Sequence, residues 1–342
     1  MRAGLSAQVV RTIQASRADS TKSCYDAKWL GFQRWCIGRG EDPLACSLPE
    51  VLSFLQLLMD RGLAHATIKV YAAAISSCHE GWGGTHVFAH PLVKRFLQGV
   101  RRRRPVTRTS VPQWELPLVL EALCKGPYEP IERSSLKALS LKTAFLLALT
   151  SAKRISELCA LSVNPSCLLI RGDRSGATLR PNPAFVPKNI RSSFRSRDIH
   201  LEAFHLPPHG DPSQAKMHLL CPVRALAYYV ERTASVRSTQ QLLVCYGDGV
   251  VGKALSKNRL ARWLCECISA AYDRAGRTPP AGIRAHSTRA VAASAALFSG
   301  ASVEDICTAA SWASPWPFIR FYLLDVSGSF SGSVLSVGTQ NK

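Results

Sequence analysis

The feature that most constrains how this chain folds is a run of four arginines followed by proline, Arg101–Pro105. From Lys94 to Arg108 there are seven basic residues and no acidic one, and the run leads into a Pro- and Thr-bearing stretch. A chain of 342 residues is longer than one hydrophobic core usually grows. The sequence therefore predicts two domains that meet here: a helical domain over 15–105, a linker over 106–115, a second domain over 116–326, and a Gly/Ser-rich tail over 327–342.

Charge and composition indicate the class of partner. Hydrophobic residues make up 46% of the chain and charged residues 19%, so it can bury a sizeable core, which excludes wholesale disorder. The formal net charge is +20, which over a folded surface favours a polyanionic partner, nucleic acid first. The arginine run itself fits two interpretations equally well, direct phosphate contact or a solvated face that acts as a localisation signal.

Several classes of protein are excluded. The longest apolar stretches fall far short of the roughly 18 residues that a membrane-spanning helix needs. The N-terminus has no apolar core of a secretory signal, so the chain is expected to stay in a reducing compartment. Its 12 cysteines form no CxxC pair and are expected to be small buried hydrophobes rather than disulfides or zinc ligands.

The first hundred residues have helical periodicity throughout. Ser20 or Thr21 is expected to cap an amphipathic helix with aromatic residues at three- and four-residue spacing. Ser47 and Glu50 form a capping box for a second helix, a third begins near His65, and Pro91 opens a fourth. Four short helices predict a compact bundle.

The second region mixes helical and strand periodicity, which predicts a mostly α fold with a small antiparallel β-sheet. The expected helices cover Leu116–Leu123, Leu136–Leu149 entered through Ser134, Arg154–Leu161, Val223–Arg232, Leu255–Tyr272, Thr288–Ser299, Val303–Ala310 and Pro315–Leu324. The expected strands cover Cys167–Ile170, Ala177–Arg180, Ala184–Val186 and Asp198–Leu201, with one more possible at Leu242–Tyr246.

The chemistry suggested by the sequence is metal-free. The chain has no phosphate-binding loop, dinucleotide fingerprint or carboxylate cluster for metal-assisted phosphoryl transfer. Attack on a phosphodiester without a metal needs cationic donors for the non-bridging oxygens, an acid for the leaving oxygen and a nucleophile. Arginine suits the first task because its planar guanidinium group can bind two phosphate oxygens at once and stays protonated. The C-terminal half supplies such groups in order: Arg154 with Glu157, His286 with Arg289, Trp312 and Tyr322.

Taken together, these residues and their spacing resemble the tyrosine recombinase (phage-type integrase) family, and their local sequence resembles the recombinases of DIRS- and Ngaro-like retrotransposons. Each residue alone has a plainer interpretation, since Tyr322 also fits the apolar stripe of a helix and Arg154 with Glu157 an exposed ion pair. The order and spacing of these residues together favour the family resemblance over the plainer interpretations. The resemblance implies a helical, SAM-like core-binding domain and a catalytic domain that close as a C-shaped clamp around duplex DNA.

The resemblance also implies a role for each site residue. Arg154 and Arg289 would clamp the phosphate, with His286 as acid–base partner between them. Trp312 stands where the family has His or Trp, and its indole N–H can donate to a phosphate oxygen. Tyr322 would be the nucleophile that forms a 3′-phosphotyrosyl link, with no metal, ATP or other cofactor.

Two further residues complete the implied site. The family's general-acid lysine lies on a β-hairpin between the first arginine and the HxxR motif. Lys188 is the first choice for it, with Lys153, Lys253 and Lys257 as alternatives. Glu157 matches an acidic family position that orients the site.

Partners and location follow from the same reading. The expected DNA contacts at the end of the helical domain are Lys94, Arg95, Arg101, Arg102, Arg103 and Arg104. The expected activity is DNA recombination and integration for a mobile element such as a retrotransposon, by a homo-oligomer that forms a tetrameric synapse on DNA, in the nucleus and not at a membrane. The alternatives are a DNA-binding relic that has lost catalysis and a topoisomerase-like DNA relaxer.

Overall fold

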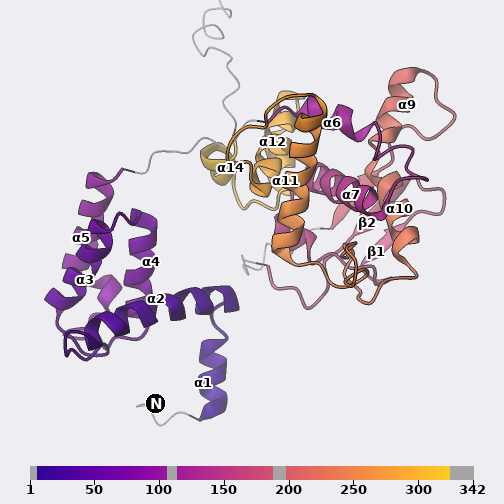
Figure 1. Ribbon diagram of the computed structural model, residues 1–342. Coiled ribbons are helices and arrows are strands. Elements are labelled where there is room, and N and C mark those ends of the chain that lie inside the picture. Colours follow the sequence, from indigo (N-terminus) through magenta and orange to yellow (C-terminus); the bar gives the residue numbers. More distant parts are fainter. Residues whose placement is uncertain (1–5, 106–113, 188–197, 324–342) are drawn as a thin grey trace, which may run out of the picture. The chain divides into compact units, whose positions relative to one another are not determined.

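The computed structural model describes residues 6–105, 114–187 and 198–323 (Figure 1). The chain divides into two compact units, which we call unit 1 (Met1–Thr109) and unit 2 (Ser110–Lys342). Each unit has its own hydrophobic core and is described by itself.

Unit 1 is a bundle of helices around an aromatic core. Phe32 and Phe54 meet edge to face at its centre, with ring centroids 5.1 Å apart, and Leu55, Ile68 and Val93 are fully buried around them. Such aromatic pairs stabilise a core beyond the area that they bury. The helices are α1 (Ala7–Gln14), α2 (Asp19–Ile37), α3 (Leu48–Asp60), α4 (His65–Ser76) and α5 (Pro91–Arg103), with a 3₁₀ turn at Val87–Ala89.

The helix starts in unit 1 partly correct the sequence predictions. The first long helix has Ala18 at its N-cap, so the predicted caps Ser20 and Thr21 lie inside its first turn. Ser47 does occupy the N-cap of α3, but in the described structure its side chain makes no capping hydrogen bond. The sequence analysis missed α1, which Ser6 caps by accepting a hydrogen bond from the backbone N–H of Val9.

Unit 2 is organised around α7, a helix that is buried on nearly every side. Its residues from 138 to 148 are all buried, and α10, α11 and α12 pack against it (Figure 1). A helix that is buried on nearly every side in this way belongs in the middle of a domain. The helices are α6 (Leu116–Leu123), α7 (Leu136–Ser151), α8 (Ile155–Leu158), α9 (Pro212–Leu219), α10 (Pro222–Thr233), α11 (Lys257–Arg274), α12 (Ala285–Phe298), α13 (Val303–Ala309) and α14 (Pro315–Phe321).

Polar residues on α7 are satisfied inside this core. Thr143 donates to the backbone carbonyl of Ala225, and Lys142 donates to the carbonyl of Leu123 and to the Glu129 carboxylate. Arg224 binds the same carboxylate through two hydrogen bonds of 2.7 and 3.1 Å. Buried charges are tolerated when they are paired in this way. The network ties α7, α10 and the chain between α6 and α7 into one body.

A small sheet of three strands lies beside the helices. The strands are β1 (Leu168–Ile170), β2 (Gly176–Leu179) and β3 (Ile199–Glu202), in the order β1-β2-β3, and both pairs are antiparallel. Leu168 pairs with Leu179, and Leu179 pairs with Ile199. The predicted class, mostly α with a small antiparallel sheet, is confirmed.

Two of the predicted strands are wrong. Residues 184–186 follow a turn in which the Asn182 side chain accepts from the backbone N–H of Ala184, a local bond that replaces strand pairing. Residues 242–245 are buried, and within 242–246 the described structure has only an isolated bridge between Val244 and Ala254. Tyr229 donates to the carbonyl of Val244 and accepts from its N–H, and Arg237 donates to the carbonyl of Leu242, so side chains take part of the backbone pairing that a strand would have.

Helix boundaries in unit 2 also shift. Ser135, not Ser134, caps α7 by accepting from the N–H of Ala138. The helix expected over 154–161 is the single turn α8, and the last one ends at Phe321. The short helix α9, capped by Asp211, was missed. Across the described ranges, we find no helix long and apolar enough to cross a membrane.

Candidate active site

Residues from four separate segments of unit 2 converge on one site. Arg154 and Glu157 come from the start of α8, His286 and Arg289 from the first turns of α12, and Trp312 from the turn after α13. Tyr322 follows directly after α14, which lies beside α12 (Figure 1). Direct contacts join all six of these predicted residues, as described below.

Glu157 links the two arginines. Its carboxylate accepts from the backbone N–H of Arg154 at 2.7 Å and pairs with the Arg154 guanidinium at 3.3 Å. The same carboxylate lies 3.8 Å from Nη1 of Arg289. The Glu157 side chain is only 6% exposed, so it holds both guanidinium groups from the protein side. This geometry explains the acidic residue one turn after Arg154.

Arg289 is the most deeply buried cation of the site. It is 2% exposed, and its Nη2 donates to the backbone carbonyl of Ala310 at 2.5 Å. Its Cζ lies 4.5 Å from the centre of the Trp312 ring, a cation–π contact. Within the described structure, its Nε and Nη1 have no hydrogen-bond partner. Two unsatisfied donors on one buried cation are costly, and an anion bound at the site would satisfy them.

The tyrosine and the histidine are already in contact. His286 Nε2 and the Tyr322 hydroxyl lie 2.5 Å apart. The Tyr322 ring also packs on Trp312, with centroids 4.8 Å apart, and the Arg289 guanidinium lies 5.5 Å from its centre. Ser294 donates to the backbone carbonyl of Tyr322 at 3.2 Å. The phenol is thus held beside a base and beside a cation, in the same chain.

The electrostatics of the site favour an anion. Desolvation, then Arg154, lowers the pKa of Arg289 to about 10, while Tyr322 and Glu157 act in the opposite direction. Desolvation and the charges of Arg289 and Arg154 also lower the pKa of His286 below its ordinary value of 6.5. Cations that depress one another's pKa gain energy when a negative charge binds between them. His286 is therefore neutral at pH 7 and able to accept a proton.

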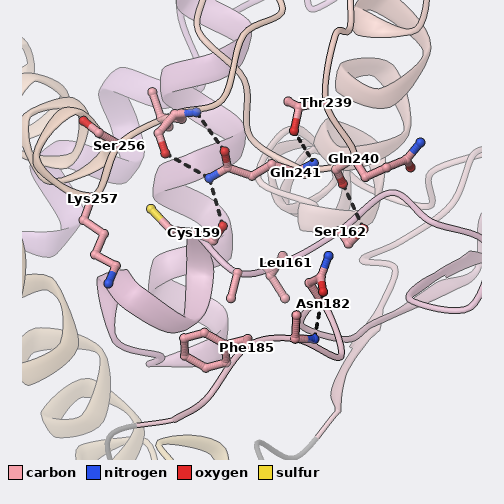
Figure 2. A pocket seen from close by; sticks show the side chains of 13 residues that line it. Cys159, Leu161, Ser162, Asn182, Phe185, Thr239, Gln240, Gln241, Ser256 and Lys257 are labelled. Carbon is pink, nitrogen blue, oxygen red and sulfur yellow. Dashed lines mark hydrogen bonds between the residues drawn. The ribbon is translucent and has the colours of Figure 1, made fainter. Parts of the chain in front are cut away.

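The described residues do not include Lys188, the predicted general acid, which belongs to the connection between β2 and β3. Of the three alternatives, Lys153 is buried and donates to Ser311, and Lys253 donates to the carbonyl of Gly249 on the surface. Lys257 lines a pocket of about 510 Å³ shown in Figure 2.

The pocket in Figure 2 is separate from this constellation. Gln241 spans its upper part, donating to the carbonyls of Cys159 and Leu255, and Lys257 reaches down one side (Figure 2). None of the residues that line it is one of the six convergent residues. Within residues 6–105, 114–187 and 198–323, no group of three His, Cys, Asp or Glu residues is placed to hold a metal ion.

The basic residues predicted to contact DNA lie in unit 1. Lys94, Arg95 and the side chains of residues 101–103 are exposed on α5, and Arg104 is partly exposed just beyond its end. The charges of Lys69 and Arg101, after desolvation, lower the pKa of His65 on α4. Lys69 of α4 and Arg101 of α5 therefore both lie near His65, and sequence reasoning missed Lys69.

In unit 2 the sequence analysis also missed two serines, Ser287 and Ser311. Ser311, which joins Lys153, has a left-handed backbone with a φ of 52°. Ser287 lies between His286 and Arg289 and accepts a hydrogen bond of 3.0 Å from the indole of Trp114. No sequence pattern marks either serine, because each is identified only by a neighbour more than a hundred residues away.

No family model matches the chain. Among curated proteins, the chain is similar to an integrase/recombinase xerD homolog of Selenomonas ruminantium, 27% identical over 157 residues. The match covers 45% of this chain and 44% of that protein, so it spans less than half of the relative's length.

Two solved structures share the fold over nearly the whole chain. One is a lambda integrase dimer bound to a COC′ core site, 14% identical with a TM-score of 0.53, covering 94% of this chain and 96% of that chain. The other is the Tn1549 transposon integrase in complex with transposon right end DNA, 13% identical with a TM-score of 0.53, covering 97% of each chain. At such low identity the likeness concerns the fold alone.

Proposed function

We propose that this chain, which belongs to the tyrosine recombinase and integrase family, cleaves DNA strands and rejoins them to new ends. The observation that carries the proposal is the contact of the Tyr322 hydroxyl with His286 beside Arg289, a buried arginine with two unsatisfied donors. A phenol next to a neutral base and a preformed anion site is the arrangement that attack on a phosphodiester requires.

In the proposed cleavage step, the Tyr322 oxygen replaces the 5′ oxygen on phosphorus. The Tyr322 oxygen attacks phosphorus, its proton passes to His286 Nε2, and the bond between phosphorus and the 5′ oxygen breaks. Arg289 and Arg154 neutralise the non-bridging oxygens as charge builds on them. The products are a 3′-phosphotyrosyl link and a 5′-oxygen that takes a proton from a lysine, for which Lys188 is our candidate.

Rejoining is the reverse reaction. A 5′-hydroxyl of another strand gives its proton to the lysine and attacks the phosphotyrosyl phosphorus. The bond between phosphorus and the Tyr322 oxygen breaks, and Tyr322 takes back its proton from His286. One bond of similar energy replaces another at each step, so the reaction needs no ATP, and the family resemblance implies no metal ion. The chemistry rests on donors that the chain itself supplies.

Unit 1 and the arginine run Arg101–Arg104 are the proposed DNA-gripping parts. The exposed cations on α5 and Lys69 on α4 support this role, because such a surface binds the phosphate backbone without reading the sequence. We further propose that copies of the chain act together as a tetramer on duplex DNA, for a mobile element of the retrotransposon kind, in the nucleus. The assignment to a mobile element and the nuclear location rest on the resemblance of the sequence motifs.

The test is incubation of the full chain with a duplex that carries a nick close to the cleavage site. The short released strand diffuses away, which traps the protein on the 3′ end as a covalent adduct visible on a denaturing gel. Tyr322→Phe is the matched control, since it removes the hydroxyl and leaves the ring packed on Trp312. We expect an adduct with the wild type, none with Tyr322→Phe, and the same DNA affinity for both.

Other outcomes separate the alternatives. DNA binding without an adduct would indicate a relic that has lost catalysis. An adduct together with relaxation of supercoiled DNA, but without joining of two different duplexes, would indicate a DNA relaxer. An adduct that persists in Tyr322→Phe would show that another residue is the nucleophile.

A further inference from the structure

Lys153 is a buried lysine beside the site, for which the proposed chemistry has no task. It is 5% exposed and immediately precedes Arg154. The chain reaches it through Ala152, whose φ of 48° ends α7 in a left-handed turn. Left-handed backbone is uncommon for a residue with a Cβ and persists only where the surroundings hold it. The surrounding fold therefore holds the Lys153 ammonium group in a fixed position beside Arg154.

The partner of Lys153 lies on a different segment of the site. Its Nζ donates to the hydroxyl of Ser311 at 2.6 Å, across 158 positions of sequence. Ser311 is itself left-handed, with a φ of 52°. Two strained turns, one after α7 and one after α13, are thus joined by one charge-assisted hydrogen bond, which is among the stronger kinds.

Ser311 stands at the centre of a turn whose other two residues hold Arg289. We call Ala310, Ser311 and Trp312 the 310–312 turn. The carbonyl of Ala310 accepts from Arg289, and the ring of Trp312 lies against the Arg289 guanidinium. Both flanking residues are buried. The position of the turn therefore sets where Arg289 points.

We propose that Lys153 is a positioning residue that fixes the 310–312 turn and, through it, Arg289 and Trp312. The inference rests on the proposed function, since it gives Lys153 a task within that reaction. Arg154, its neighbour in sequence, is one phosphate clamp, and the turn holds the other. Because Lys153 and Arg154 are adjacent in the chain, this short segment fixes the position of Arg154 relative to Arg289. Displacement of a reacting group by about 1 Å can cost a hundredfold in rate.

The competing role for Lys153 is that of general acid, one of the alternatives that the sequence leaves open. Its bond to Ser311 argues for positioning. The side chain also lines a cavity of about 570 Å³ together with Asp198, His200 and Asp305. The two roles make different predictions about the leaving group, because only a general acid has to protonate it.

The experiment measures the rate of covalent adduct formation on nicked DNA for Lys153→Met, Ser311→Ala and the double variant. Lys125→Met is the control, a lysine in an exposed surface pair with Glu121. We expect Lys153→Met to slow cleavage by about ten- to a hundredfold with DNA affinity unchanged. Ser311→Ala should slow it to a similar degree, and the double variant should be no slower than Lys153→Met, because both remove one interaction.

A second substrate distinguishes the roles. When sulfur replaces the 5′ bridging oxygen, the leaving group departs without protonation, so loss of a general acid no longer slows cleavage. If Lys153 positions other groups, Lys153→Met slows cleavage of this substrate as much as it slows cleavage of ordinary DNA, and that outcome supports the proposal. Full rescue of Lys153→Met by sulfur, or additive effects of the two single variants, overturns it.

A third comparison tests the route through Arg289. Lys153→Met should add little to the defect of Arg289→Lys, because the positioned group is already impaired, whereas a variant that merely loosens the fold would add its full effect. Rates are taken at a temperature where thermal unfolding shows every variant folded. Failure of the wild type to form an adduct would contradict the proposed function, whereas a wild-type rate in Lys153→Met would contradict this proposal alone.

Discussion

Arg289→Met is expected to change activity and stability in opposite directions. The substitution removes the guanidinium and keeps an unbranched side chain that fills most of its volume. If Arg289 exists to bind a phosphate, the folded protein carries a cost that only DNA relieves. Cleavage should then fall at least a hundredfold, while the free energy of unfolding without DNA rises or falls by no more than about 1 kcal/mol.

The stability part follows from the hydrogen bonds of Arg289. Its Nε and Nη1 are buried donors with no hydrogen-bond partner in the described structure, and each such donor costs about 1–3 kcal/mol. Methionine removes both, a gain of about 2–6 kcal/mol. Against this, the carbonyl of Ala310 loses its donor at about 1–3 kcal/mol, and Glu157 loses a charge at 3.8 Å. Glu157 keeps Arg154 as a partner, so the net change lies between a loss of about 1 kcal/mol and a gain of about 5 kcal/mol.

The activity part follows from the same two atoms. Loss of one preorganised donor to a charged transition state costs a factor of about 10²–10³, and Arg289 has two donors to offer. Lysine restores the charge but not the fork, so Arg289→Lys should recover only part of the rate.

The assay pairs urea unfolding with the rate of adduct formation on nicked DNA. Arg277→Met is the matched control, because Arg277 forms an exposed ion pair with Glu115 and should leave both readings near the wild type. A fall in stability of several kcal/mol in Arg289→Met would refute the reasoning, since it would make Arg289 a structural residue. So would a cleavage rate within threefold of the wild type.

The remaining predictions concern His286 and the arginine run Arg101–Arg104. Because the folded protein holds the pKa of His286 below 6.5, the unfolded chain binds the extra proton first, so acidification from pH 7.5 to 5.5 should destabilise the fold. His286→Asn should reduce that loss in urea unfolding at the two pH values, and an unchanged loss would show that other histidines carry it. Replacing all four arginines of the run with Gln should flatten the slope of log affinity against log salt by about two to four units, at about 0.9 per phosphate contact, with cleavage of bound DNA intact. An unchanged slope would mean that the run touches no phosphate.

Much of the site could be predicted because its residues repeat a known order along the chain. The resemblance of their order and spacing to the tyrosine recombinase family singled out Arg154, His286, Arg289, Trp312 and Tyr322, and the structure brings all five together. Spacing could not give their contacts. That Glu157 lies between two guanidinium groups depends on how α8 packs against α12, which no local pattern encodes.

The fold was predictable where periodicity is long. Apolar spacing predicted α7 and α11 within a few residues, because many buried positions share one register. The strand prediction at 242–246 was wrong because burial alone does not make a strand. Most of those residues are buried, but Tyr229 and Arg237 take up backbone groups of Val244 and Leu242 that a strand would pair, and no local pattern shows this.

The small residues beneath the site explain why its geometry depends on packing and not on the motif alone. Ala292 and Ala293 of α12 meet Ala310 and Phe318 in a cluster separate from the main core of unit 2. Alanine side chains let helices approach closely, so α13 and α14 come near enough to α12 for Arg289 to reach the carbonyl of Ala310 and for His286 to reach Tyr322. The same HxxR motif above bulkier residues would hold the phenol further from its base. The alanines, which carry no chemistry, are therefore as much a part of the arrangement as the residues that do.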